Sequence, residues 1–166
     1  MPIDLQMNWL TAVDFAPYGD VIECAGAPDK MINAGMCGRF HDRAKIDIVD
    51  GATGISLFDA KARQLPYLLD MVERHPLGSQ AFIPMSQTCF MVIVADDQDG
   101  VPVNPRAFLT KDGQSINIYR NIWHGVLAPL GAAGQYAVVD RIGTGANLQE
   151  HYFETPYLIS AAPVIS

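Results

Sequence analysis

Residues 89–119 read CFMVIVADDQDGVPVNPRAFLTKDGQSINIY. The run Cys89–Ala95 is the longest apolar stretch of the chain, and Arg106–Thr110 and Ser115–Tyr119 follow with further β-branched and aromatic residues. Asp112-Gly113 lies between the last two runs and is typical of a tight hairpin turn. This stretch therefore predicts several short strands joined by turns.

The same pattern recurs along the rest of the chain, where 14 Gly and 11 Pro are evenly spread. Further strands are predicted at Asp20–Cys24, Arg39–Val49, Gly54–Phe58, Gln80–Pro84, Trp123–Leu127 and Gln135–Arg141. Thr11 predicts the cap of a short helix, and a second short helix is possible over Ala60–Leu69, where Pro66 would limit it. So many short strands predict an all-β fold, as a closed or double-sheet antiparallel barrel.

The length, charge and composition of the chain exclude several classes of protein. The chain has 166 residues, a net charge of −7, 49% hydrophobic residues and 17% charged residues. These values predict one folded domain over residues 1–166 and exclude a disordered chain. No basic patch suits a nucleic acid, and no apolar run approaches the length of a membrane span.

The start of the chain lacks the features of a signal peptide. Cys24, Cys37 and Cys89 show neither metal-site nor disulfide spacing. We therefore expect a soluble cytoplasmic protein with reduced cysteines.

Glu73 and His75 precede the strand Gln80–Pro84. In extended backbone, alternate side chains point to the same face, so these two are expected to lie side by side. A carboxylate beside an imidazole can act as a base with its orienting group or as two metal ligands. A surface turn with an incidental ion pair is the other interpretation.

A second polar segment contains Tyr119, Arg120, Asn121 and His124. Arg can bind a carboxylate through two hydrogen bonds, Tyr and Asn can bind neutral oxygens, and His can transfer a proton. The alternative is structural, with Trp123 in the core, His124 buried and satisfied, and Arg120 solvated.

The spacing of these two segments resembles the two signatures of the cupin superfamily. Glu73-x-His75-x4-Gln80 follows the first, with Glu for its first histidine, Gln for its acid, and Gln87 where a glycine would complete it. Gly113-x5-Tyr119-x-Asn121-x2-His124 follows the second. The resemblance implies a cupin-like jelly-roll barrel with one or two short helices and an altered metal centre.

Longer blocks resemble the ureidoglycolate lyase family. They are FAPYGDVI at 15–22, RFHD at 39–42, ERHPLGSQAFIPM at 73–85, YRNIWH at 119–124 and VDR at 139–141. The match after Arg141 is less clear. This resemblance implies a cupin homodimer that splits ureidoglycolate into glyoxylate and urea, late in allantoin (purine) breakdown.

Such a cleavage is an elimination, which needs one base and one acid but no redox cofactor. We expect His124 or His75 to take the hydroxyl proton, while Glu73 orients the base or holds the second proton. For the substrate carboxylate the candidates are Arg120 and Arg39, and for the ureido group Gln80, Tyr119 and Asn121. Arg141 beside Asp140 is a further candidate, although a structural ion pair is the simpler interpretation.

Three alternatives remain open from the sequence. Glu73, His75, Gln80 and His124 could together bind a divalent metal, although the first expectation is that none is required. The chain could be another cupin enzyme that uses such a metal on a different small acid. It could also be a cupin that binds a small acid without catalysis.

Overall fold

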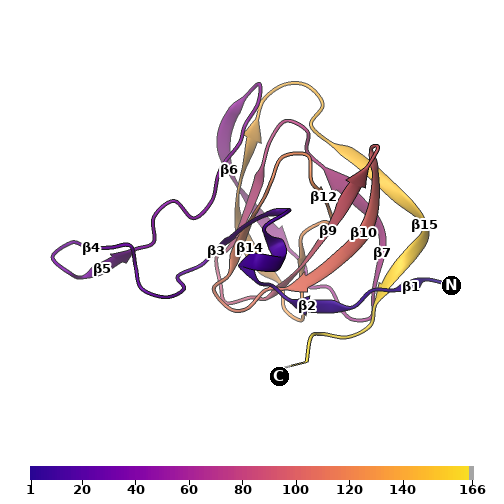
Figure 1. Ribbon diagram of the computed structural model, residues 1–166, viewed down its shortest axis with the longest axis horizontal. Coiled ribbons are helices and arrows are strands. Elements are labelled where there is room, and N and C mark those ends of the chain that lie inside the picture. Colours follow the sequence, from indigo (N-terminus) through magenta and orange to yellow (C-terminus); the bar gives the residue numbers. More distant parts are fainter. Residues whose placement is uncertain (165–166) are drawn as a thin grey trace.

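Two packed β-sheets and a small two-stranded sheet make up the computed structural model, which describes residues 1–164 (Figure 1). The prediction of an all-β fold is confirmed, in its double-sheet form. No helix within these residues is long and apolar enough to cross a bilayer.

Sheet A has 8 strands, seven of them in the order β1-β15-β7-β12-β9-β10-β2, with β13 also paired to β9. Its strands are β1 (Ile3–Asp4), β2 (Met7–Trp9), β7 (Tyr67–Arg74), β9 (Phe90–Gln98), β10 (Val101–Leu109), β12 (Trp123–His124), β13 (Ala128–Pro129) and β15 (Gln149–Ile159). Sheet B has 5 strands in the order β3-β11-β8-β14-β6. Its strands are β3 (Gly19–Ile22), β6 (Ala52–Ala60), β8 (Gln80–Pro84), β11 (Ser115–Ile118) and β14 (Gly134–Ile142).

Strand β9 is covered on both faces, which explains why its sequence is continuously apolar instead of alternating. Phe90, Val92 and Val94 join the core between the two sheets, together with residues of β8, β11 and β14. Met91 and Ile93 join a second core on the opposite face of sheet A, where the sheet curls until β10 contacts β15.

Helix α1 (Ala12–Phe15) begins as predicted at Thr11, whose hydroxyl accepts a hydrogen bond from the Asp14 amide. Of its three apolar side chains only Phe15 is buried, while Ala12 and Val13 face solvent. Gly19 follows at the start of β3 and pairs with Ile118 of β11. The helix is thereby held against the edge of sheet B.

Two predicted elements between residues 39 and 69 are wrong. Ala60–Leu69 is not a helix, because β6 runs to Ala60, β7 begins at Tyr67, and Arg63 forms a bridge to Leu130 between them. Arg39–Val49 is not one strand. Only Arg39 belongs to a strand, and the following residues run irregularly until Ile48 bridges to Gly78.

The hairpin predicted at Asp112-Gly113 is also wrong, because the turn there leads from β10 in sheet A to β11 in sheet B. The Asp-Gly hairpin lies instead at Asp99-Gly100, at the end of the acidic run Asp96-Asp97-Gln98-Asp99-Gly100. Both residues have positive φ, 53° and 83°, as this tight turn requires, and they join β9 to β10. The strand predicted over Trp123–Leu127 ends already at His124.

The remaining two strands form a projecting hairpin. Strands β4 (Lys30–Ile32) and β5 (Cys37–Arg39) pair only with each other, and Figure 1 shows them standing away from the two large sheets.

Gly19 provides a test of this packing. A methyl group at Gly19 would overlap the Asn117 carbonyl oxygen and press on the Phe15 ring, both of which are fixed by the core. Gly19→Ala is therefore expected to lower the free energy of unfolding by about 3 kcal/mol, which thermal denaturation would register as a clear drop in Tm.

The matched control is Gly26→Ala, which has the same change in side chain but open space around it. Its positive φ costs only about 1 kcal/mol. Equal effects of the two substitutions would show that the contact at Gly19 does not constrain the fold.

Candidate functional site

Glu73, His75 and His124 converge at the centre of sheet A. Glu73 lies near the end of β7, His75 follows directly, and β12 pairs His124 opposite Glu73. One ligand atom from each of the three side chains lies within 4.8 Å of the others, and Glu73 Oε1 is 3.7 Å from His75 Nε2. The structure thus places Glu73 and His75 side by side, as alternation predicts, and adds His124 from 49 residues further along the chain.

Backbone carbonyls hold one nitrogen of each imidazole. His75 Nδ1 lies 2.8 Å from the Asn147 carbonyl oxygen, and His124 Nδ1 lies 3.0 Å from that of Gly125. A carbonyl can only accept, so each Nδ1 carries a proton and each Nε2 has a free lone pair when the ring is neutral. Both Nε2 atoms are buried without a hydrogen-bond partner among residues 1–164.

The two histidines differ in charge. Burial, reinforced by the charge of His75, lowers the pKa of His124 to about 4. Burial also acts to lower the pKa of His75, but the Glu73 carboxylate 3.7 Å away, the Asn147 carbonyl and the charge of Asp140 outweigh burial and raise it. The adjacent His75 imidazole lowers the pKa of Glu73. At neutral pH the site therefore combines a neutral His124, an ionised Glu73 and a readily protonated His75.

A pocket of about 450 Å³ reaches this cluster at Glu73. Gln80, on β8 of sheet B, lines the same pocket, and its amide nitrogen donates to Asp140 over 3.3 Å. Its buried Oε1 has no partner within the described chain. Phe58, Phe82 and Leu127 provide apolar walls.

Arg63 contributes the only positive charge to the lining of this pocket. Its backbone is fixed, because the Arg63 amide donates to the Pro129 carbonyl over 2.7 Å and its carbonyl accepts from Gly131. Its guanidinium forms no ion pair with a carboxylate of residues 1–164. The guanidinium is therefore not neutralised by a direct ion pair within these residues, while the carboxylates of Asp59 and Glu73 line the same pocket.

Three other predicted site residues lie in the turn from β11 to β12 and have their own partners. The Tyr119 hydroxyl donates to Asp20 over 2.6 Å, and this hydrogen bond raises the pKa of Tyr119 to about 12. Arg120 pairs with Asp47 over 3.0 Å. Asn121, at φ 68°, donates its amide to the His75 carbonyl over 2.9 Å, so its backbone holds the position of His75.

The other two arginines predicted for the site, Arg39 and Arg141, also lie outside the pocket lining. Arg39 is exposed on β5 in the projecting hairpin. Arg141 is buried and donates to the carbonyls of Val49, Asp50 and Thr144, so it fastens two loops and forms no ion pair with Asp140.

Sequence reasoning missed two contributors, Arg63 and Asn147. Arg63 falls within Ala60–Leu69, where the sequence allows a short helix, and no motif surrounds it. Asn147 acts through its carbonyl on His75, while its side chain accepts from the Leu77 amide over 2.7 Å. A main-chain role of this kind gives no signal in residue types.

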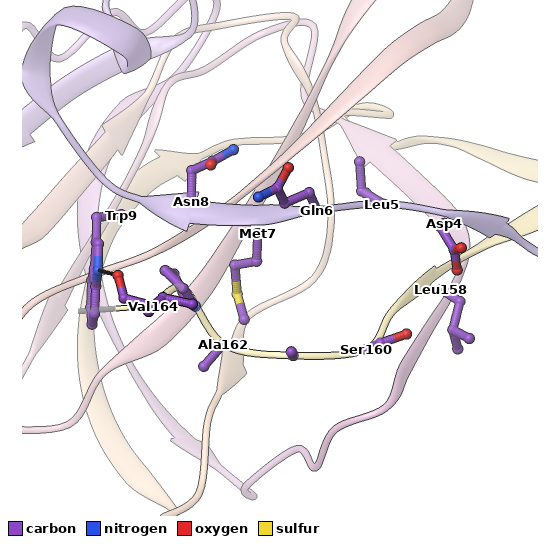
Figure 2. Close-up of a pocket in the computed structure, with 12 residues that line it drawn as sticks. Asp4, Leu5, Gln6, Met7, Asn8, Trp9, Leu158, Ser160, Ala162 and Val164 are labelled. Atoms are coloured by element: carbon purple, nitrogen blue, oxygen red, sulfur yellow. Dashed lines mark hydrogen bonds between the residues drawn. The ribbon is translucent and has the colours of Figure 1, made fainter. Parts of the chain in front are cut away.

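A larger pocket, of about 540 Å³, lies between residues 4–9 and the C-terminal segment 158–164 (Figure 2). At one end the Trp9 indole donates to the Val164 carbonyl over 3.3 Å. Among the described residues, Asp4 is the one ionisable side chain in its lining. It offers no pair of groups for acid–base chemistry, so the smaller pocket at Glu73 is the candidate active site.

The family model for ureidoglycolate lyases matches residues 2–160. A protein named ureidoglycolate lyase from Rhodobacter capsulatus is 62% identical over 93% of this chain and 97% of its own. One named ureidoglycolate lyase 2 from Rhizobium meliloti is 47% identical over 96% of this chain and 99% of its own.

Among solved structures, a dTDP sugar isomerase from Desulfovibrio desulfuricans aligns with 80% of each chain, at 17% identity and a TM-score of 0.43, too distant a similarity to bear on the argument. The family match covers almost the whole chain, including the part after Arg141 that resembled the family less clearly. This chain belongs to the ureidoglycolate lyase family.

Proposed function

We propose that this chain is a ureidoglycolate lyase that releases glyoxylate and urea in allantoin breakdown. One observation carries the proposal. In a chain 62% identical to a protein named ureidoglycolate lyase, the buried His124 and the partly buried Glu73 and His75 form an acid–base cluster beside a pocket lined by one cation.

The elimination needs two proton transfers of opposite direction. His124, neutral at physiological pH, takes the proton of the substrate hydroxyl through Nε2. As the aldehyde forms, the carbon–nitrogen bond breaks and its electron pair goes to the ureido nitrogen. His75, protonated and paired with Glu73, gives that nitrogen its proton. Two nearby groups with opposite pKa shifts are suited to such a division of roles.

Arg63 is proposed to bind the substrate carboxylate. Arg63 is preferred to Arg39 and Arg120 because it lines the pocket and pairs with no carboxylate of residues 1–164. Gln80 is proposed to hold the ureido group. Tyr119 and Asn121 belong to the frame of the site, through Asp20 and the His75 carbonyl respectively.

A divalent metal is the second candidate for this site. The two buried Nε2 atoms without partners, their Nδ1–H groups on carbonyls, and the adjacent Glu73 fit the usual arrangement of metal-binding imidazoles. Glu73, His75 and His124 would hold the ion, with Gln80 as a weaker neutral ligand. Such an ion would polarise an oxygen of the substrate.

The proposed setting is a cytoplasmic homodimer. The three cysteines, Cys24, Cys37 and Cys89, are free in the structure, which supports a reducing compartment. Unpaired outer strands of both sheets, such as β6, support association with a second copy.

The direct test is glyoxylate release from fresh ureidoglycolate, corrected for spontaneous decay, with and without chelator. Release that resists the chelator supports the acid–base route. Release that the chelator stops and one divalent ion restores supports the metal route. No release under either condition would contradict the proposed activity.

The acid–base route depends most strongly on His124, because this residue is the proposed base. His124→Gln keeps a polar side chain of similar size but removes the base, so turnover should fall by about 10²-fold or more. Circular dichroism checks that the variant is folded. His151→Ala is the control, because His151 packs against Trp123 and Phe153, outside the cluster, and should leave turnover unchanged.

The pH dependence follows from the two pKa shifts. Activity requires neutral His124, whose pKa is about 4, and protonated His75, whose pKa is raised above 6.5. The rate should therefore fall as the pH drops toward 4 and fall again above neutrality. A rate that keeps rising between pH 6.5 and 8 would contradict His75 as the acid.

The proposed role of Arg63 in binding the substrate carboxylate is tested by measuring KM and kcat separately. A hydrogen bond to a charged group contributes about 1.5–3 kcal/mol, so Arg63→Leu should raise KM by about 10- to 100-fold with a smaller effect on kcat. Lys61→Leu removes a neighbouring exposed cation that does not line the pocket and serves as the control. An unchanged KM in Arg63→Leu would exclude Arg63 as the carboxylate-binding residue.

A further inference from the structure

Residues 24–44, here called the arm, have no core of their own. Not one residue of the arm is buried, although it includes the paired strands β4 and β5. Within the described chain, every hydrogen bond of the arm runs to another arm residue, such as His41 and Arg43 to Asp29. The first bonds to the large sheets begin only at Lys45.

An isolated two-stranded hairpin is at best marginally stable in water. The arm in addition exposes large apolar side chains, Met31 at 52% and Met36 at 86%. A hairpin surrounded by solvent buries too little apolar area to be stable by itself. We therefore take its ordered conformation to indicate that another surface covers it.

A matching uncovered surface lies on the outer side of sheet B. Ile55 and Leu57 of β6 are 74% and 71% exposed, and Ile83 and Met85 extend the surface over and beyond β8. Ala137 and Val139 of β14 lie between them, opposite Leu57 and Ile55. We call these six residues the apolar face. Positions that alternate toward solvent in an antiparallel sheet are ordinarily polar, and these are not.

The total surface area agrees with a covered arm. The chain exposes 9357 Å², whereas a compact monomer of 18.1 kDa exposes about 8,100 Å². The excess of about 1,300 Å² exceeds the roughly 800 Å² that each partner buries in a standard stable interface.

We propose that the arm of each copy packs on the apolar face of a second copy of this chain. The inference rests on the homodimer proposed above and names its interface. Because both surfaces belong to one chain, a two-fold arrangement covers both arms and both faces at once. The arm has three cations and two carboxylates, so it meets a chain of net charge −7 without adding to the repulsion.

Cross-linking of the full chain tests this pairing. Leu57→Cys places a thiol on the apolar face, and Cys37 is already exposed on the arm. Isotopically light and heavy protein are mixed, treated with a short bis-maleimide and digested. We expect light–heavy peptides that join Cys37 to position 57, and none in Val13→Cys, which places an equally exposed thiol on α1.

Sedimentation velocity gives the second readout. Leu57→Lys and Met36→Lys should each weaken the dimer by about tenfold or more while circular dichroism stays unchanged, and Val13→Lys should not. Cross-links between copies at other positions, or cross-links of the arm only to its own chain, would contradict the proposed interface. Neither result would contradict the homodimer itself. A monomer at micromolar concentration would overturn both the interface and the homodimer. Glyoxylate release from the same samples tests the activity separately.

Discussion

Strand β9 is packed on both faces, and this constraint organises the molecule. One set of its side chains joins the two sheets, and the other fills the curl of sheet A. The short strand β12 pairs directly with β9, His124 with Val94 and Trp123 with Ala95. The cluster of Glu73, His75 and His124 is thereby attached to the buried part of β9, where a side-chain position is little free to vary.

Trp123 fixes β12 from the other side. The Arg74 guanidinium lies 4.3 Å from the centre of its ring, and the indole nitrogen donates to Asp97 over 2.8 Å. With Trp123 held on one face of sheet A, His124 is directed to the other, toward Glu73 and His75. The burial that fixes the position of the His124 side chain also lowers its pKa, so both properties have the same cause. Its ring centre is 5.2 Å from that of His75, too close for both rings to be protonated without strong repulsion.

Short-range patterns predicted β8 with its observed bounds, most of β9, β11 and β14, and the pairing of Glu73 with His75. The longest strand, β15, escaped prediction because it is half exposed, contains Pro156 and shifts register between Tyr152 and Tyr157, which removes any alternation. Arg63 was missed because its place in the pocket depends on a bridge to Leu130, a contact between distant parts of the chain. Local sequence thus indicates the candidate residues Glu73 and His75, whereas the groups that surround them follow from tertiary pairing.

In the proposed site His124 is held neutral and His75 is readily protonated. Nitrogen NMR of the two imidazoles during a pH titration measures this directly. We expect His124 to remain neutral, with its proton on Nδ1, until the pH approaches 4, while His75 titrates above 6.5. A His124 that titrates near 6.5, or a His75 that loses its proton first, would contradict the account.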